Sequence, residues 1–208
     1  MKVHIESEVP PVNLAEVLAV NNYPNRERFE RLTRCLEGNG ARVTSIDWGD
    51  ASAKKFDTFN GVVLSGSPDM MSWKTAHTKF QAEVDAIRDS SVPVLGVCFG
   101  HQMIAHAFGS EVVHDSQHVL KFVKTRILAA DSLFEGLPRT LMLLESRHEV
   151  VKSLPAGFEL LATSETSSIA AMKHRRRPLY GVQSHPERYS KENPAGDRVV
   201  GNFVRLLG

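Results

Sequence analysis

The chain has 208 residues, 42% of them hydrophobic and 24% charged, which is the balance of an ordinary globular protein. Its 25 lysines and arginines against 24 aspartates and glutamates leave a formal net charge of +1, which excludes nucleic-acid binding driven by bulk charge and an acidic disordered chain. Two cysteines, Cys35 and Cys98, are too few for a disulfide framework, and no Cys-x-x-Cys pair indicates structural zinc. A functional cysteine should therefore act as a single reactive thiol.

No repeat, low-complexity tract or Pro/Gly/Ser-rich linker divides the sequence, so we expect one domain over 1–208, with 1–15 as an N-terminal lead-in. Residues 1–16 lack the apolar core of a secretory signal, and no window approaches the roughly 20 apolar residues of a membrane helix. We therefore expect a cytoplasmic protein that binds neither membrane nor nucleic acid.

The first half alternates short apolar runs with longer amphipathic stretches. In chain order, the patterns predict a strand at 17–20, a helix at 25–38, strands at 43–46 and 61–64, a helix at 75–90, a strand at 92–97 and a helix at 99–109. Near-continuous apolar strands that alternate with helices are typical of an α/β fold with a parallel sheet covered on both faces.

The second half changes character, because strand-like runs follow one another with short turns between them. The runs lie at 121–128, 140–144, 158–163, 169–173 and 179–183, and a closing helix is expected at 197–207. They predict an antiparallel extension of the same, mostly parallel, sheet.

The most informative stretch runs from Val92 to Gln102, where an apolar strand enters Gly96-x-Cys98-x-Gly100 and then a helix. This is the nucleophile-elbow pattern with cysteine in place of serine. A sharp strand-to-helix turn strains the central residue and brings neighbouring chain so close that side chains at 96 and 100 would clash. A lone cysteine is more often a buried structural residue, but this context favours a nucleophile for Cys98. Cys35 lacks such a context and is interpreted as structural.

A thiol nucleophile needs a base, and His185 is the strongest candidate among nine histidines. It follows an apolar strand, Pro186 fixes the turn after it, and Glu187 can hold the far nitrogen of its imidazole, which gives a Cys–His–Glu relay. His-Pro-Glu alone is a weak signal, more often a surface turn. The other histidines favour plainer interpretations: His101 and His106 pack or face solvent, and His114 and His118 lie solvated in a polar loop without a third metal ligand.

Three motifs together carry a resemblance: Leu64-Ser-Gly-Ser-Pro68, Gly96-Val-Cys-Phe-Gly-His-Gln102 and Gly181-Val-Gln-Ser-His-Pro-Glu187. Their order and spacing resemble the class I, triad-type glutamine amidotransferase family, and within it the glutaminase domains and free-standing subunits of the GMP synthase group. The resemblance covers the chain from about Val17 to its end. It implies a flavodoxin-like α/β fold with an antiparallel extension.

The resemblance also implies roles for individual residues. Cys98 would be the nucleophile, His185 the general acid and base, and Glu187 its orienting partner. The backbone N–H groups of Gly66 and Phe99 would form the oxyanion hole. Gln102, Arg147 and His148 would bind the substrate. Residues 146–149 fall where the family has a substrate-contacting loop, although a plain polar turn is an equally good interpretation.

The implied reaction needs no metal or organic cofactor. Cys98 would attack the side-chain amide of glutamine, ammonia would leave, and water would hydrolyse the glutamyl thioester. No phosphate-binding loop of the Walker type occurs, and 65–69 only faintly resembles a pyrophosphate-binding loop. The ammonia would therefore serve a separate ATP-dependent synthase subunit. Residues 174–177 are a possible docking patch for it, although a solvated hairpin turn is the better interpretation.

Some residues depart from the family pattern. Ser67 replaces the second glycine of the Ser-Gly-Gly-Pro turn, Ser184 stands where an aromatic residue often precedes the histidine, and Arg147 and His148 differ from the GMP synthase pattern. Two alternatives therefore stay open. One is a gamma-glutamyl peptide hydrolase on the same fold, with a wider pocket near Gln102 and Arg147. The other is a non-catalytic regulatory domain.

Overall fold

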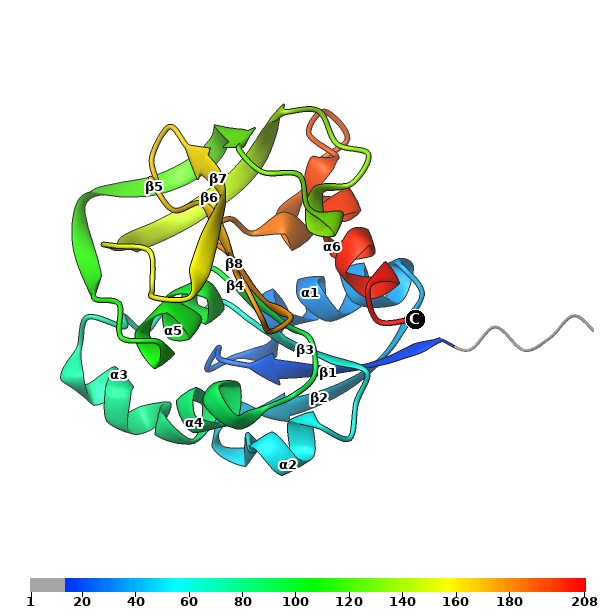
Figure 1. Cartoon of the computed structure of the whole chain (residues 1–208), viewed down its shortest axis with the longest axis vertical. Helices are drawn as coiled ribbons and strands as arrows, with labels where there is room; N and C mark the ends of the chain where they lie inside the picture. The colour runs from blue at the N-terminus through cyan, green and yellow to red at the C-terminus, as the bar shows by residue number, and fades with distance from the viewer. Residues whose placement is uncertain (1–13) are drawn as a thin grey trace, which may run out of the picture.

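Five parallel strands form one half of the sheet in residues 14–208, the part of the chain that the computed structural model describes (Figure 1). In spatial order they are β2 (Ala41–Asp47), β1 (Ala15–Asn21), β3 (Gly61–Leu64), β4 (Val94–Val97) and β9 (Leu179–Val182). Because parallel strands run in the same direction, the carboxyl ends of β1, β3, β4 and β9 meet at one edge of the sheet.

Antiparallel strands extend this sheet beyond β9. They are β8 (Ala171–His174), β7 (Phe158–Ser164), β5 (Val112–Ile127) and β6 (Thr140–Val151). The full order is β2-β1-β3-β4-β9-β8-β7-β5-β6. The predicted fold, a mostly parallel sheet with an antiparallel extension, is confirmed.

Helices cover both faces, and the strands alternate accordingly. Val17 and Ala19 of β1 pack into the same hydrophobic cluster as α1 (Arg26–Gly38) and α6 (Ala195–Arg205), which lie together in Figure 1. Leu18 and Val20 face the opposite cluster, with α2 (Ala53–Phe56), α4 (Gln81–Asp89) and α5 (Phe99–Ala107). The remaining short elements are α3 (Lys74–Lys79), η1 (Trp48–Asp50), η2 (Ser132–Phe134) and η3 (Pro186–Arg188).

Some predicted boundaries were wrong. The helix expected at 75–90 is two helices, α3 and α4, because Phe80 leaves helical geometry (φ −103°, ψ 14°). Its fully buried ring packs against Trp48 and Phe99, so tertiary packing overrides the continuous helical pattern. The expected lead-in at 1–15 lies outside the described residues except for Leu14 and Ala15, and Ala15 already begins β1.

The largest errors concern β5 and β6, both much longer than expected. His114 and His118 lie on β5 at an irregularity in its pairing with β6, not in a polar loop. Residues 146–149 belong to β6, so the polar-turn interpretation of that segment was wrong. A strand with one solvated face carries many polar residues, and its sequence therefore resembles that of a loop.

The basic segment 174–177 is tied to the fold. The Arg177 guanidinium donates to the carbonyls of Ile87 and Ser90 at the end of α4, and Arg175 Nε donates to the carbonyl of Phe158. This favours the hairpin-turn interpretation over a docking patch. In residues 14–208 no helix is both long and apolar enough to cross a membrane.

Candidate active site

Cys98 occupies the turn between β4 and α5 with φ 51° and ψ −98°. It is the only non-glycine residue with a positive φ in the described part of the chain. Such backbone angles are costly for a side-chain-bearing residue and persist where the surrounding structure enforces them. The predicted strained elbow is confirmed.

The two glycines of the elbow are required by close approach of the backbone. A Cβ on Gly96 would collide with the carbonyl group of Gly100, and a Cβ on Gly100 would lie 2.6 Å from the carbonyl oxygen of Leu64. Neither obstacle is a flexible side chain, so larger residues would displace α5 from the sheet. The predicted reason for both glycines is confirmed.

The sulfur of Cys98 lies among polar groups at the start of α5. Its Sγ is 3.6 Å from the carbonyl oxygen of Ser146 and 3.8 Å from Nε2 of Gln183. Phe99 is the first helical residue, so its N–H has no partner within the helix. The sulfur therefore lies at the positive end of the helix dipole, where negative charge is stabilised.

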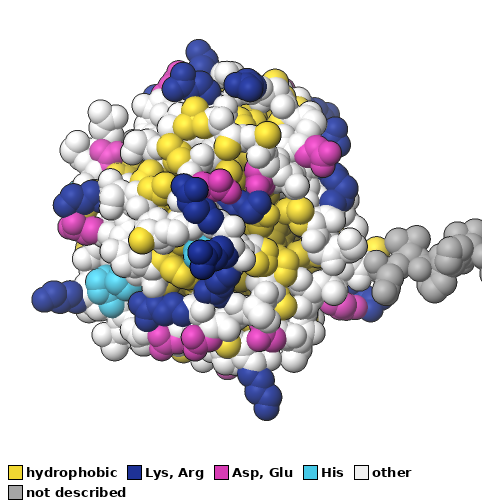
Figure 2. Space-filling model, in the orientation of Figure 1, with side chains coloured by type: hydrophobic (Ala, Val, Ile, Leu, Met, Phe, Trp, Pro, Cys, Tyr) yellow, Lys and Arg dark blue, Asp and Glu magenta, His cyan; other side chains and the backbone are white. Residues whose placement is uncertain are grey.

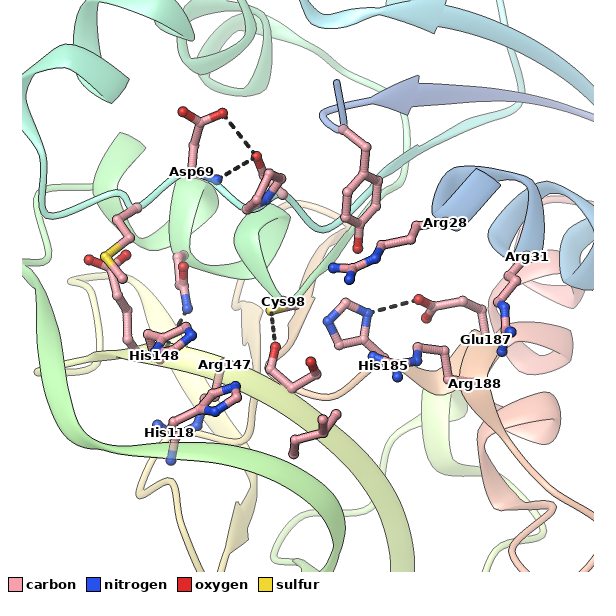
Figure 3. A pocket seen from close by; sticks show the side chains of 18 of the residues that line it. Arg28, Arg31, Asp69, Cys98, His118, Arg147, His148, His185, Glu187 and Arg188 are labelled. Carbon is pink, nitrogen blue, oxygen red and sulfur yellow. Dashed lines mark hydrogen bonds and ion pairs between the residues drawn. The ribbon is translucent and has the colours of Figure 1, made fainter. Parts of the chain in front are cut away.

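His185 lies just beyond β9, beside β4, and its ring is placed between Cys98 and Glu187 (Figure 3). Its Nδ1 is 2.8 Å from Oε1 of Glu187, and both side chains are buried. The backbone N–H of His185 donates to the carbonyl of Leu144 at 2.7 Å, which fixes the residue against β6. Burial alone would lower the pKa of His185, but the negative charges of Cys98 and Glu187 outweigh it and raise the pKa to about 10. This arrangement favours the imidazolium form of His185.

Gly66, which follows β3, faces the same point. A Cβ there would lie 2.8 Å from Cε1 of His185 and would collide with the hydroxyl of Tyr23. Tyr23 is a site residue that the sequence analysis missed. Burial and the nearby charges of Glu187 and Cys98 raise its pKa, so its hydroxyl stays protonated and can donate. The available signal was its place just after the first strand, at the sheet edge where α/β folds bind ligands.

These residues line a cavity of about 650 Å³. Six of the eight predicted site residues line it: Cys98, Gln102, Arg147, His148, His185 and Glu187. Gly66 and Phe99, expected to act through their backbones, adjoin the lining residues Ser67 and Cys98. Arginines of α1 and η3 also line it, namely Arg28, Arg31 and Arg188. Figure 2 shows basic side chains at the centre of the face viewed, with acidic and hydrophobic side chains around them.

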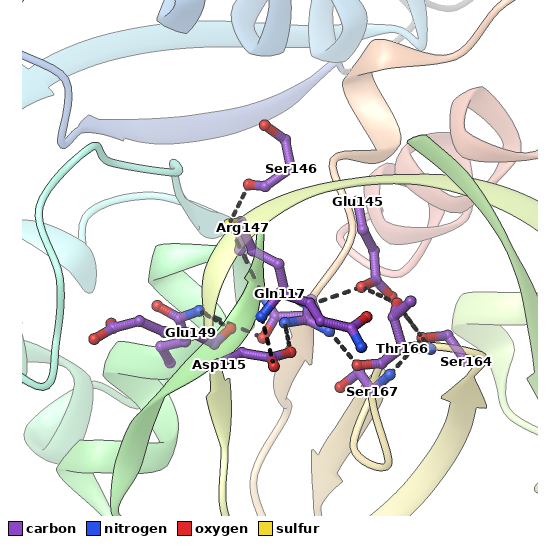
Figure 4. Close-up of polar contacts among 12 residues, drawn as sticks. Asp115, Gln117, Glu145, Ser146, Arg147, Glu149, Ser164, Thr166 and Ser167 are labelled. Carbon is purple, nitrogen blue, oxygen red and sulfur yellow. Dashed lines mark hydrogen bonds and ion pairs between the residues drawn. The ribbon is translucent and has the colours of Figure 1, made fainter. Parts of the chain in front are cut away.

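The side chain of Arg147 lies in the protein interior, and Figure 4 shows its polar contacts. Its side chain has no exposure, and its guanidinium donates to Glu145 at 2.9 Å, to Asp115 at 2.7 Å and to the carbonyl of Thr166. Arg147 therefore contributes its backbone, and not its side chain, to the cavity wall. His148 points to the other side of β6, where it is exposed and stacked on His118 with ring centroids 4.1 Å apart.

Gln102 and Glu149 join the walls of the cavity. Gln102 Nε2 donates to the carbonyl of Glu149 at 3.1 Å and to Oε1 of Gln183 at 3.4 Å. The Glu149 carboxylate accepts the backbone N–H groups of Met71 at 2.7 Å and Ser72 at 3.1 Å. Glu149 therefore ties β6 to the segment that follows the Gly66 turn, a contact between distant parts of the chain that no local pattern predicts.

The fold and this site define a protein with a cysteine elbow beside a histidine–carboxylate pair. Over residues 25–206 the chain matches the family model described as glutamine amidotransferase class-I. It is 42% identical over 148 residues to a GMP synthase (glutamine-hydrolyzing) subunit of Thermococcus kodakarensis, an alignment that covers 71% of this chain and 76% of that one. The same-named protein of Methanothermobacter thermautotrophicus is 36% identical over 188 residues, or 90% and 95% of the two chains.

Solved structures agree. A protein of Thermoplasma acidophilum assigned as a GMP synthase subunit superposes with a TM-score of 0.82 at 27% identity, over 93% of this chain and 94% of that one. A glutamine amidotransferase of Thermotoga maritima shares the fold, with a TM-score of 0.69 at 21% identity over 84% and 77%. The chain belongs to the class I glutamine amidotransferase family.

Proposed function

We propose that this glutamine amidotransferase hydrolyses the side-chain amide of glutamine through a Cys98 thioester, with His185 as general acid and base and Glu187 as its orienting partner. The observation that carries the proposal is the strained Cys98 elbow next to the buried His185–Glu187 pair, whose Nδ1–Oε1 distance is 2.8 Å. Strain and buried charge are costly, and they concentrate where chemistry requires them.

In the first half-reaction, the Cys98 thiolate attacks the amide carbon and a carbon–sulfur bond forms. The carbonyl oxygen takes up the negative charge, which the backbone N–H groups of Gly66 and Phe99 receive. The His185 imidazolium then gives its proton to the amide nitrogen, the carbon–nitrogen bond breaks and ammonia leaves. Glu187 holds the imidazole through Nδ1, so that Nε2 is directed to the reacting atoms.

In the second half-reaction, water replaces ammonia. Acylation removes the negative charge of Cys98, which is one of the causes of the raised His185 pKa. His185, now neutral, can take a proton from water, and the resulting hydroxide attacks the thioester. Collapse of the tetrahedral intermediate breaks the carbon–sulfur bond and releases the product as a carboxylic acid, which loses its proton to solvent to give glutamate. The thiolate and imidazolium return together.

For the substrate's amino-acid end, we propose the wall formed by β6 and α5. Gln102 fixes the backbone at Glu149, and Arg147 holds β6 from behind, so these side chains shape the wall. His148 is exposed at the rim, where it can meet the substrate's carboxylate directly. We therefore expect Arg147 to contact the substrate through its backbone and not through its guanidinium.

The ammonia would pass to a separate ATP-dependent synthase subunit in the cytoplasm. The relatives are named as subunits of GMP synthase, which supports guanylate synthesis as the acceptor reaction. The exposed residues at the cavity mouth offer a surface where such a synthase can receive ammonia: Arg28, Arg31 and Leu120.

A gamma-glutamyl peptide hydrolase is the second candidate, favoured by a cavity of about 650 Å³, which is larger than one glutamine requires. The test compares ammonia release from glutamine and hydrolysis of a gamma-glutamyl dipeptide by wild type and Cys98→Ala, with and without the candidate synthase. We expect turnover of glutamine that Cys98→Ala abolishes. Equal activity of the two proteins, or turnover of the dipeptide alone, would reject the proposal. Failure of Cys98 to react with a glutamine-like electrophile would favour the regulatory alternative.

A further inference from the structure

Two buried polar residues lie behind the Gly66 turn and take no part in the triad. Asn22 follows β1, Glu83 lies on α4, and neither has any exposed surface. Because burying a polar group costs free energy unless it is hydrogen-bonded, these residues need compensating contacts. Their contacts lead to the Gly66 turn.

Asn22 and Ser65 connect the ends of two neighbouring strands. Asn22 donates its backbone N–H to Ser65 Oγ at 2.9 Å, and Ser65 Oγ donates to the carbonyl of Gly66 at 2.9 Å. Asn22 Nδ2 donates to the carbonyl of Ser65 at 3.3 Å and to Oε1 of Glu83 at 3.2 Å. The carbonyl groups of both Ser65 and Gly66 are therefore held from behind.

Because of peptide geometry, these contacts also set the direction of the Gly66 N–H, which belongs to the proposed oxyanion hole. The carbonyl of Ser65 and the N–H of Gly66 belong to one planar trans peptide and point in opposite directions. A hydrogen bond that holds this carbonyl thus also aims the N–H. Since glycine rotates more freely than any other residue, Gly66 would not fix the direction by itself.

Glu83 contacts the same Asn22 amide from α4. With Nδ2 toward Ser65, the amide donates to the Ser65 carbonyl and to Glu83 Oε1, whereas the flipped amide would place its own oxygen against the Ser65 carbonyl. Burial raises the pKa of Glu83 to about 8, so the carboxyl is mainly neutral at pH 7 and can stay beside an amide without a counter-ion. Within residues 14–208, Glu83 Oε2 and Asn22 Oδ1 have no hydrogen-bond partner.

We propose that Asn22 and Glu83 are a positioning pair for the oxyanion hole: Glu83 orients the Asn22 amide, and Asn22 aims the Gly66 N–H at the tetrahedral intermediate. This inference rests on the proposed function. Neither residue touches the substrate. Because the oxyanion exists only after attack, the pair should contribute to kcat and leave ground-state binding of glutamine unchanged.

The test compares Asn22→Asp, which replaces the donor Nδ2 by an acceptor, with Glu83→Gln, which keeps an acceptor for it. Loss of one oxyanion donor costs about 10²–10³-fold in kcat, and we expect Asn22→Asp to lose at least about tenfold with KM within about twofold. Glutamate γ-semialdehyde, whose hemithioacetal with Cys98 uses the same hole, should bind more weakly by a similar factor. Glu83→Gln should stay within about threefold of wild type, whereas Glu83→Leu should resemble Asn22→Asp.

Asn202→Asp is the matched control for a purely structural effect. Asn202 is a buried asparagine on α6 whose Nδ2 donates to the carbonyls of Leu133 at 2.9 Å and Glu135 at 3.0 Å, and it does not line the cavity. We expect it to lose stability but to keep kcat in the folded protein. If Asn22→Asp behaves like this control, or raises KM without weakening aldehyde binding, the inference is wrong.

A wild type that hydrolyses no glutamine would reject the proposed function, and crystal structures would still decide the inference. A turned Ser65–Gly66 peptide in Asn22→Asp would support the positioning pair. An unchanged peptide would overturn it.

Discussion

Replacing Arg147 by methionine tests whether this residue acts inside the protein or on the substrate. The change removes a guanidinium without exposure from Glu145, which is 1% exposed, and from Asp115, which is 25% exposed. Removing one partner of a buried ion pair costs about 3–5 kcal/mol. Glu145 keeps donors in Ser164 Oγ at 2.6 Å and Thr166 Oγ1 at 2.7 Å. We therefore expect Arg147→Met to lower the free energy of unfolding by about 3 kcal/mol, the lower end of this range.

The free energy of unfolding, measured by urea titration, gives this cost directly, and the melting temperature should fall by roughly 6–12 °C. Arg147→Met combined with Glu145→Leu should recover much of the loss, because an apolar pair can replace a buried ion pair at little cost. The control is Arg42→Met, which breaks the exposed Arg42–Glu16 pair, also short at 2.6 Å, and should cost no more than about 1 kcal/mol.

Kinetics on the folded variant complete the test. We expect a KM for glutamine within about threefold of wild type, because the guanidinium faces the interior. A loss of less than about 1 kcal/mol in stability together with a tenfold higher KM would refute this reasoning and return Arg147 to direct substrate binding.

Three further predictions concern the proposed catalytic centre and the two cysteines. Gly66→Ala, whose Cβ would lie 2.8 Å from His185 Cε1, should lower kcat at least about tenfold while the circular dichroism spectrum stays native. The pKa of His185 in the folded protein is raised to about 10. Its contribution to stability is therefore complete below about pH 6.5 and is lost as the pH rises through 10. Because Cys98 is one cause of the raised value, NMR titration of Cys98→Ala should find a lower His185 pKa. Burial raises the pKa of Cys35 to about 12, so iodoacetamide at pH 8 should label Cys98 and leave Cys35 unmodified, as peptide mass mapping would show.

The elbow was predictable from the sequence because its causes are local. Strand, tight turn and helix follow one another within about ten residues, and Gly96 and Gly100 record the close approach of the chain. The parallel strands were predictable for the same reason, since strands buried on both faces are apolar throughout. His185 and Glu187 are two residues apart, so their pairing also left a local signal.

The remaining parts depend on contacts across the sheet. Glu149 meets Met71 and Arg147 meets Asp115 only after β5 and β6 pair, and their polar residues alone resemble a loop. Asn22 and Glu83 are 61 residues apart, so nothing in either segment indicates the other. Phe80 shows the converse, because a continuous helical pattern is broken by packing that the pattern does not contain.

The backbone of Cys98 implies a conflict between folding and catalysis at one residue. Holding a non-glycine side chain at φ 51° costs about 1–3 kcal/mol, and glycine would relieve most of it. Selection for stability alone would thus remove the very residue on which the proposed chemistry depends. On the proposed function, a cysteine at this position reflects selection for activity, and a glycine in a descendant of this chain would mark the loss of that selection.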